Sequence, residues 1–325
     1  MIPRSFFLLF GSLAALAIVV GGVFYAIREG VGPLLDPERC TATTSDHSVS
    51  LTHDQAENAS IIAAVAERRG MPARAVTIAL ATAYQESKIE NLSGGDRDSL
   101  GLFQQRPSQG WGTPEQIRDP YYATGAFYDA LEKVDGYVDM EVTKAAQAVQ
   151  RSAFPDAYAD HEQDARTVAS ALTGNSQGAF SCVVDDSNAA HQAAGASGLT
   201  GRAEQLRRDL DTAFGDLSLG GFSPGGVTAG HMEGSAHYDG RAIDIFFRPV
   251  SPEQTRRGWV TAHYLVANAR RLAIVHVIFD DRIWTAGAAS ENSWRDYDPP
   301  GLSRDDPAER RVILEHRDHV HVDVA

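Results

Sequence analysis

A change of character halfway along the chain constrains the fold most. Residues 174–200 are rich in Gly, Ser and Ala, a composition typical of a linker. Before them, residues 53–173 carry helix caps and helix stops, such as the capping box in TPEQI, and no convincing strand pattern. After them, residues 201–325 contain the runs AIDIFF, LAIVHVIFD and HVHVDV, which favour strands between helices. The sequence therefore predicts a mostly-α domain followed by an α+β domain.

The N-terminus carries an uncharged run. Residues 5–27 contain no Asp, Glu, Lys or Arg, and roughly 20 apolar residues in a helix span a bilayer core. A cleaved signal peptide is the alternative, although its apolar core is only about 7–15 residues long. We expect a retained transmembrane helix over 5–27, a cytoplasmic stub over 1–4 and a stalk over 28–52. The expected localisation is the cell membrane, with a single pass and the bulk of the chain outside the cytoplasm.

Charge and cysteine content bear on partners and compartment. The formal net charge is −14, which disfavours nucleic acid because phosphate contacts need clustered Lys and Arg. Cys40 and Cys182 are the two cysteines, and an extracytoplasmic compartment permits a disulfide between them. Such a bridge closes the termini of the first domain. Two unpaired thiols are the alternative, and two cysteines so far apart do not make a zinc ribbon.

Glu86 is the first candidate for chemistry. It follows an apolar helical run, and burial raises the pKa of a carboxyl group, as a general acid needs. On position alone, a Glu at a helix end is more often a solvated surface residue. The motifs around it change that expectation.

An ES pair, then GLFQ, then DPYYATGAFYDAL resemble the soluble lytic transglycosylases and goose-type lysozymes. The resemblance covers residues 53–173 and implies a lysozyme-like α fold that cleaves the MurNAc–GlcNAc bond of peptidoglycan. It implies Glu86 as the catalytic acid, Gln104 as a residue lining the sugar cleft, and Tyr121 and Tyr122 near the helix that closes the cleft. The stretch AVQRSAFPDAY departs from the family's AYNxG, so the resemblance does not define the sugar subsites.

The reaction depends on a second carboxylate. With Glu86 alone, the acid later acts as the base and an anhydro product forms; with a second carboxylate that positions water, hydrolysis results. Asp96 and Asp98 are the candidates, Asp96 first. The alternative for both is turn chemistry, because SGGDRDS is a natural loop.

The second candidate site combines the segment GSAHYDGRAID, residues 234–244, with the C-terminal HRDHVHVDV. His237 precedes a small Gly-containing turn, and Asp244 lies in the strand that follows. His319 and His321 are two apart on a strand and so face the same side. Imidazole and carboxylate suit Zn²⁺, and a catalytic zinc keeps one coordination position open.

The patterns S-x-H-x-x-G-x-A-x-D and H-x-x-H-x-H resemble the zinc peptidases typified by D-Ala-D-Ala carboxypeptidases and related cell-wall endopeptidases, whose fold the hedgehog signalling domain shares. The resemblance covers about residues 200–325. It implies one Zn²⁺ held by His237, Asp244 and His321. His319 and His316 match the additional histidines of the pattern, and Asp318 stands where some relatives carry a Glu base. We rank His319 first as the catalytic helper and Asp318 second.

One departure concerns the substrate. Carboxypeptidases of this type place an Arg upstream to hold the terminal carboxylate, and GDLSLGGFSPGGVTAGHMEG contains none. The domain therefore has the alternative of binding peptide stems without cutting them. Trp259, Trp284 and Trp294 either line a cleft or, as we favour, pack in the core.

Together, these features predict a multidomain chain with an N-terminal transmembrane helix, a mostly-α lysozyme-like domain and an α+β zinc-peptidase-like domain. The expected function is a membrane-anchored bifunctional peptidoglycan hydrolase that cleaves glycan strands and peptide stems. The expected partners are peptidoglycan and, through the helix, the lipid bilayer. The alternatives are a protein with a single activity, and a non-catalytic wall-binding or secretion-apparatus protein with one or both clefts degraded.

Overall fold

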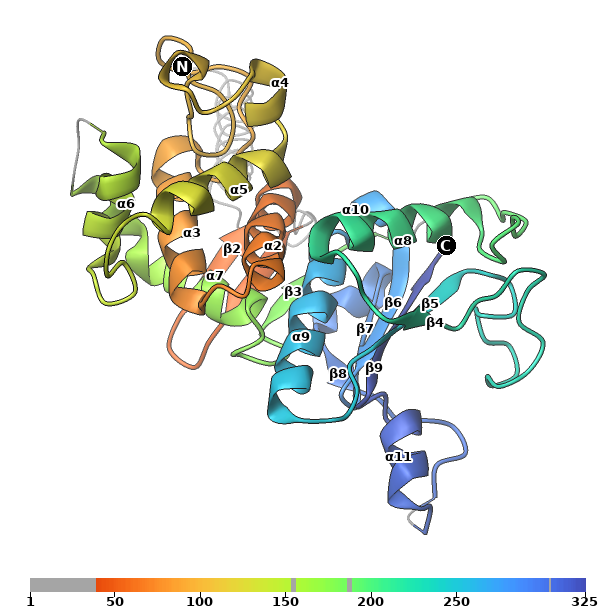
Figure 1. The fold of residues 1–325 in the computed structure, drawn as a ribbon. Coiled ribbons are helices and arrows are strands. Elements are labelled where there is room, and N and C mark those ends of the chain that lie inside the picture. Colours follow the sequence, from red (N-terminus) through yellow and green to blue (C-terminus); the bar gives the residue numbers. More distant parts are fainter. Residues whose placement is uncertain (1–38, 153–155, 186–188, 304) are drawn as a thin grey trace, which may run out of the picture. The chain divides into compact units, whose positions relative to one another are not determined.

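A computed structural model describes residues 39–152, 156–185, 189–303 and 305–325. Contacts group Cys40–Ala325 into one compact unit. Its first half is helical and its second half contains a mixed arrangement of helices around a sheet (Figure 1). The change from a mainly helical half to a half with a sheet occurs where the sequence changes character.

The helical half is built around two largely buried helices, α2 and α3, which contact each other and are joined by a short turn at Gly70. Thr52 and Gln55 form a capping box at the start of α2, and the expected capping box of Thr113 and Gln116 is confirmed. α3 also packs against α5, α6 and α7. The elements of this half are α2 (His53–Arg68), α3 (Ala73–Ser87), η1 (Pro107–Gln109), α4 (Pro114–Ile117), α5 (Pro120–Leu131), α6 (Val142–Gln150), η2 (Ala157–His161) and α7 (Glu162–Leu172).

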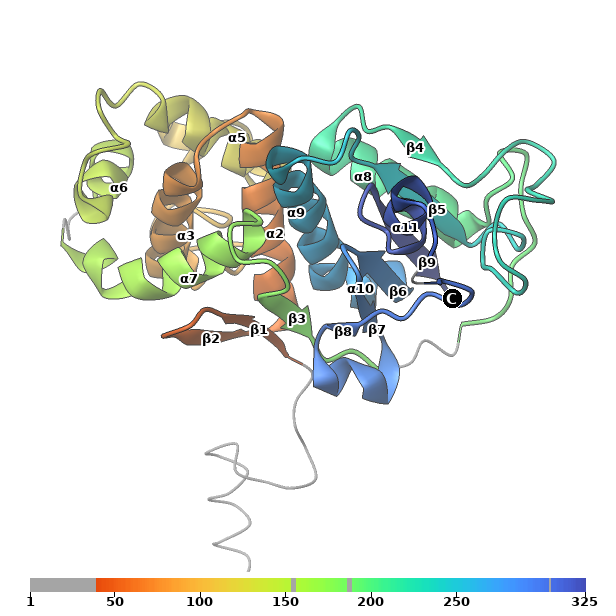
Figure 2. The same cartoon turned by 90° about the horizontal axis from the view of Figure 1, so that it is seen from below.

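A three-stranded antiparallel sheet lies against α7 (Figure 2). It comprises β1 (Cys40–Thr43), β2 (Ser48–Leu51) and β3 (Phe180–Cys182), in the order β2-β1-β3. The structure thus differs from the expected stalk and linker, because strands from both segments pair with each other. These strands are short, and their partners are far apart in the sequence, so no local pattern announced the pairing.

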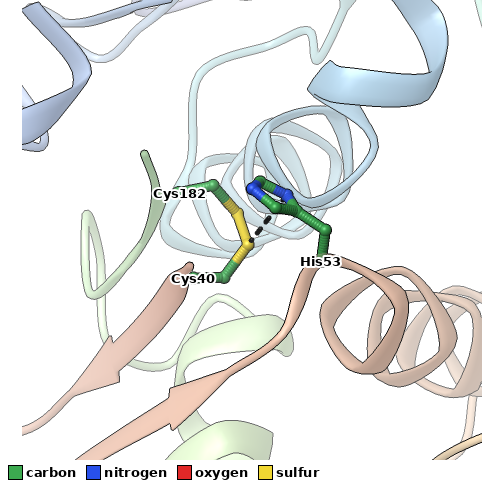
Figure 3. A group of neighbouring side chains, drawn as sticks. All are labelled: Cys40, His53 and Cys182. Atoms are coloured by element: carbon green, nitrogen blue, oxygen red, sulfur yellow. Dashed lines mark hydrogen bonds between the residues drawn. A yellow bond between two sulfur atoms is a disulfide. The ribbon is translucent and has the colours of Figure 1, made fainter. Parts of the chain in front are cut away.

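The expected disulfide between Cys40 and Cys182 is confirmed (Figure 3). The two residues face each other across β1 and β3, and the bridge closes a separation of 142 residues. His53 Nδ1 lies 3.6 Å from the Cys40 sulfur, and its Nε2 lies 3.0 Å from the carbonyl oxygen of Val183. Because the two sulfurs are bonded to each other, Cys40, His53 and Cys182 form a disulfide with a histidine beside it and not a metal site.

The second half forms a six-stranded sheet in the order β4-β5-β9-β6-β7-β8, in which all neighbours are antiparallel. The C-terminal strand β9 lies between β5 and β6 (Figure 1), and α9 packs against both β6 and β9. All three runs expected to be strands are strands. The elements are α8 (Gly201–Phe214), β4 (Leu219–Gly220), β5 (Ala242–Phe246), α9 (Pro252–Ala267), α10 (Ala269–Leu272), β6 (Ile274–Phe279), β7 (Arg282–Thr285), η3 (Gly287–Asn292), β8 (Arg295–Asp296), α11 (Ala308–Leu314) and β9 (His319–Val324).

The two halves meet mainly where α2 contacts α9. Arg256 and Arg257 on α9 both pair with Glu67 on α2, with nitrogen–oxygen distances of 3.0 Å. His263 Nδ1 lies 2.8 Å from the carbonyl oxygen of Ala171 at the end of α7. Polar contacts from one long helix therefore hold both halves in the same compact unit.

The membrane expectation needs correction. In the ranges that the structure describes, no helix is both long and apolar enough to cross a bilayer. The expected transmembrane helix over 5–27, with its stub, lies outside the described residues. The described residues form a mixed α/β arrangement, and the predictions of a transmembrane fold class and of a single-pass membrane localisation were wrong on this finding.

Candidate active sites

The register of the sheet assembles the second candidate site. β5 and β9 are antiparallel neighbours, and Asp244 lies directly opposite His321. Directly paired residues project their side chains to the same face of a sheet, so this carboxylate and this imidazole meet. His237 comes from the turn before β5, which Gly240 closes with a φ of +66°. A Cβ on Gly240 would lie 2.3 Å from the carbonyl oxygen of Gly198, so only glycine fits there.

Three buried donor atoms converge. His237 Nε2 lies 3.1 Å from His321 Nδ1 and 3.2 Å from Asp244 Oδ1, and His321 Nδ1 lies 3.2 Å from the same oxygen. Zinc binds such donors at about 2.0–2.2 Å, which places two ligands of a tetrahedral ion about 3.3–3.5 Å apart. The triangle of His237, Asp244 and His321 therefore has nearly the size that a zinc ion requires.

The outward-facing nitrogens of the two imidazoles have acceptors of their own. His237 Nδ1 donates to the carbonyl oxygen of Gly221 at 2.7 Å, so Nε2 presents its lone pair to the triangle. His321 Nε2 lies 3.4 Å from Asp323, and Asp323 also binds His276 at 3.0 Å. Metal-binding histidines almost always use their second nitrogen in this way.

The electrostatics favour a positive charge between these atoms. Burial lowers the pKa of His321, but its hydrogen bonds to Asp244 and Asp323 prevail and raise it to about 9. Burial raises the pKa of Asp244, yet the bonds from His237 and His321 hold it well below its usual range. A carboxylate that stays ionised beside two imidazole nitrogens fits a divalent metal ion, so the residues present fit zinc.

His319 lies beside the triangle, with Nε2 3.9 Å from Asp244 Oδ1. Its Nδ1 lies 2.7 Å from Asp318 Oδ1, and the other oxygen of Asp318 accepts a 2.6 Å hydrogen bond from Arg248 Nε. Burial raises the pKa of Asp318, but His319 and Arg248 lower it overall, so the carboxylate stays ionised. Asp318 is thus hydrogen-bonded to both His319 and Arg248. The ring of His316 lies 4.6 Å from that of His319, and burial lowers the pKa of His316 to about 3.

A cavity of about 700 Å³ opens over these residues. Arg241, Arg248 and Arg310 line it, although the whole chain is strongly acidic. The guanidinium of Arg248 also stacks on Phe246, 4.2 Å from the ring centroid. Each of the three arginines also pairs with a carboxylate, Asp239, Asp318 and Asp306 respectively.

The sequence interpretation missed several residues of this site. They are Gly221, His231, Tyr238, Arg248, His276 and Asp323, all of which contact an expected site residue or one another. His231 had a visible signal, since it is a further histidine six residues before His237. The partners of His276 and Arg248 depend on strand register and could not be recognised by spacing.

The first candidate site lies at the C-terminal end of α3. Glu86 is half-buried and accepts a 2.7 Å hydrogen bond from the hydroxyl of Tyr158 on η2. Burial raises the pKa of Tyr158, so this hydroxyl remains a donor. The neighbouring Ser87 donates a 2.7 Å bond to the carbonyl oxygen of Leu102. The two residues of the ES pair thus have different contacts: Ser87 binds the GLFQ loop, and Glu86 binds Tyr158.

The loop itself is internally braced. Leu100 and Gln105 form a two-residue bridge, and Gln104 folds back so that a Cβ on Gly95 would lie 1.7 Å from its Oε1. Asp98 accepts bonds from Ser108 N at 2.8 Å and Arg106 Nε at 2.6 Å. These bonds lower the pKa of Asp98, and the bond from Ser108 has the largest effect. Asp98 is therefore a loop brace, whereas Asp96 is exposed and lies 3.9 Å from Arg97.

The two expected cleft tyrosines have separate surroundings. The Tyr121 hydroxyl lies 2.8 Å from that of Tyr264 on α9, and burial raises the pKa of Tyr121 to about 12. Tyr122 is exposed and covers Gly112, where a Cβ would lie 2.8 Å from its ring. Tyr121 therefore joins the two halves of the chain, and its hydroxyl is engaged there.

The three tryptophans are buried. The indole nitrogen of Trp259 donates to Asp280, and those of Trp284 and Trp294 donate to the carbonyl oxygens of Cys182 and Phe180. They pack in the core, the interpretation that we favoured.

A comparison with protein-family models gives a match. Residues 195–307, about a third of the chain, match the family model described as VldE, C-terminal domain. The match includes His231, His237 and Asp244 and ends before β9. No curated protein matches the chain.

Proposed function

We propose that the chain is a zinc-dependent peptidase of peptidoglycan stems that also carries a glycosidase centre for glycan strands. The observation that carries the peptidase assignment is the buried triangle of His237, Asp244 and His321. Two imidazole nitrogens and a carboxylate oxygen meet there at 3.1–3.2 Å, and both imidazoles have a second hydrogen-bond partner. The carboxylates of Asp244 and Asp323 stabilise a positive charge at this point, and a metal ion that displaces the proton of His321 supplies one.

The roles at this centre follow from the contacts. His237, Asp244 and His321 would hold the ion, which supplies Lewis-acid polarisation of a peptide carbonyl when bound. His319 presents Nε2 to the same space and exchanges a proton with the substrate. Asp318, held by Arg248, keeps the His319 ring in that orientation.

A specific contact favours the glycosidase centre. The Tyr158 hydroxyl fixes one oxygen of Glu86, and Ser87 holds the GLFQ loop next to it. Glu86 would donate a proton to the leaving sugar oxygen. Because Asp98 is committed to Arg106 and Ser108, Asp96 remains the candidate for positioning water.

The test combines metal content with product analysis. The full-length chain is loaded with zinc, dialysed and measured by mass spectrometry beside His321→Ala, and both are incubated with purified peptidoglycan. We expect one zinc in the wild type and none in His321→Ala. A chelator should stop the release of peptide fragments and leave the release of glycan fragments unchanged.

The outcomes separate the alternatives. A wild type that takes up no zinc refutes the peptidase centre. Zinc uptake without peptide release identifies a wall-binding domain. Release of peptide fragments alone, or of glycan fragments alone, identifies a protein with a single activity. The masses of glycan products distinguish hydrolysis, which adds a water, from transglycosylation, which does not.

A further inference from the structure

A fourth histidine lies against the donor triangle, outside the expected ligand set. His231 belongs to the loop between β4 and β5, and its ring stacks on that of His237 with centroids 3.8 Å apart and planes 21° apart. One nitrogen of His231, one of His237 and a carboxylate oxygen of Asp244 all lie within 4.8 Å of one another. Two ligands of one zinc ion lie about 3.3–3.5 Å apart, so the His231 side chain has to turn out of its stack on His237 to bring its nitrogen into range.

The backbone of His231 is tethered beside the site. The hydroxyl of Tyr238 accepts a hydrogen bond from His231 N at 3.2 Å and donates one to His231 O at 2.5 Å. Tyr238 directly follows His237 in the sequence, so the turn that supplies one ligand also holds the loop that carries His231. This double contact places the imidazole at the site even though the loop is otherwise open.

The loop is loosely packed at its glycines. Four of its glycines have positive φ, and at each of them a Cβ would find no atom within 4 Å: Gly225, Gly226, Gly230 and Gly234. Such positions combine a wide choice of backbone conformations with an absence of packing. His231 and its neighbour Met232 also line the 700 Å³ cavity, so a substrate that enters the cavity meets this loop.

We propose that His231 is a fourth protein ligand of the metal centre, and that it closes the coordination position that a peptide carbonyl needs. This inference rests on the metal centre proposed above. A zinc ion with four protein ligands is closed, as in structural sites, whereas a catalytic zinc keeps one position free. A peptide carbonyl can therefore reach the metal only when His231 leaves it, and a substrate that enters the cavity displaces the loop over residues 222–235.

The experiment counts ligands directly. Full-length protein with its disulfide intact is loaded with zinc for X-ray absorption, and with cobalt for visible spectroscopy. Wild type is compared with His231→Ala, with Tyr238→Phe, and with His191→Ala, an exposed histidine that does not line the cavity. Circular dichroism of the metal-free proteins checks that each variant is folded.

We expect three imidazoles on the wild-type zinc and two in His231→Ala. Zinc transfer to a chelator should be at least about tenfold faster in His231→Ala, because even the loss of an outer contact to a ligand weakens metal binding about 10–100-fold. Azide should change the cobalt spectrum of His231→Ala and leave that of the wild type unchanged, and free imidazole should restore the wild-type spectrum. Tyr238→Phe should lie between the two, and His191→Ala should match the wild type.

Two failures are distinguishable. A wild type that binds neither zinc nor cobalt removes the metal centre and this proposal together. A wild type that binds zinc through two imidazoles, with chelator transfer and azide response equal to those of His231→Ala, overturns the fourth ligand alone. In that case His231 only stacks on His237.

Discussion

The two candidate centres are built from opposite kinds of structure. The metal centre joins residues far apart in the chain, and the pairing of β5 with β9 fixes Asp244 opposite His321. The Glu86 centre lies at the end of one helix, and a hydrogen bond from Tyr158 fixes its carboxylate. Sheet register sets positions through many backbone bonds at once, whereas a helix end depends on the few side chains that reach it.

This difference teaches where each centre is vulnerable. At the metal centre, both imidazoles have a second partner, Gly221 for His237 and Asp323 for His321, and Asp244 pairs with both, so the donor set acts as a unit. At the Glu86 centre, the loop and the acid are held by separate contacts, Ser87 for the loop and Tyr158 for the acid. We therefore expect substitutions to cause graded losses of function at the Glu86 centre and all-or-none losses at the metal centre.

Glu86→Gln should give the largest effect and test whether the centres are independent. The amide keeps the shape of the carboxyl group but cannot donate the proton, so glycan cleavage should fall about 10²–10⁴-fold. Zinc content and peptide release should not change, because the metal donors lie on other elements. The measurement is product release from purified peptidoglycan, with thermal unfolding to show that the fold is kept.

The matched control is Glu90→Gln, which removes an exposed carboxylate four residues further on. It should retain wild-type glycan cleavage. Wild-type cleavage by Glu86→Gln would show that another group is the acid, and a parallel loss of peptide release would show that the two centres depend on each other.

Removal of the disulfide should destabilise the helical half more than the half that carries the metal centre. Replacing Cys40 and Cys182 together by Ala should lower the free energy of unfolding by about 2–5 kcal/mol, because the unbridged chain gains conformational freedom in the unfolded state. Zinc binding at the other half should persist at low denaturant. Urea unfolding of the two proteins measures the difference, and equal midpoints would contradict it.

Much of the candidate metal centre was predictable from the sequence. His237, Asp244 and His321 carry a recognisable spacing, and the structure brings them together. Their supporting contacts were not visible. Arg248 reaches Asp318 across 70 residues and His276 reaches Asp323 across 47, and such partners follow from strand order, which no local pattern encodes.

The helical half shows the converse. Its helices and caps were predictable because capping chemistry is local, as at Thr113. The strands at Cys40–Thr43 and Phe180–Cys182 were missed because they are short and find their partners only in the folded chain. Tyr121 was predicted from its motif to lie near the helix that closes the cleft; the bond between its hydroxyl and that of Tyr264 in the other half was not predictable from that motif.

Acid should weaken the junction between the halves through His263. Burial lowers the pKa of this fully buried imidazole to about 4, compared with 6.5 in the unfolded chain. Between these values the unfolded state binds the extra proton, so stability falls as the pH falls from 6.5 to 4, by about 3 kcal/mol from this group. Unfolding of His263→Gln should depend less steeply on pH in this window, whereas the exposed-site variant His191→Gln should match the wild type. Equal slopes for His263→Gln and the wild type would remove His263 as the cause.

Tyr158→Phe should give the smallest effect and sharpen the contrast between the centres. It removes the 2.7 Å hydrogen bond to Glu86 and keeps the buried ring in place. A bond of this kind contributes about 1 kcal/mol, so glycan cleavage should fall about five- to tenfold, with zinc content unchanged. Because burial raises the pKa of Tyr158, the hydroxyl is a steady donor and not the proton source. A loss as large as that of Glu86→Gln would mean that Tyr158 shares the chemistry, and an unchanged rate would mean that the α3 backbone alone positions the acid. An intermediate loss would show that this centre is set by individual side-chain contacts, in contrast to the register that sets the metal centre.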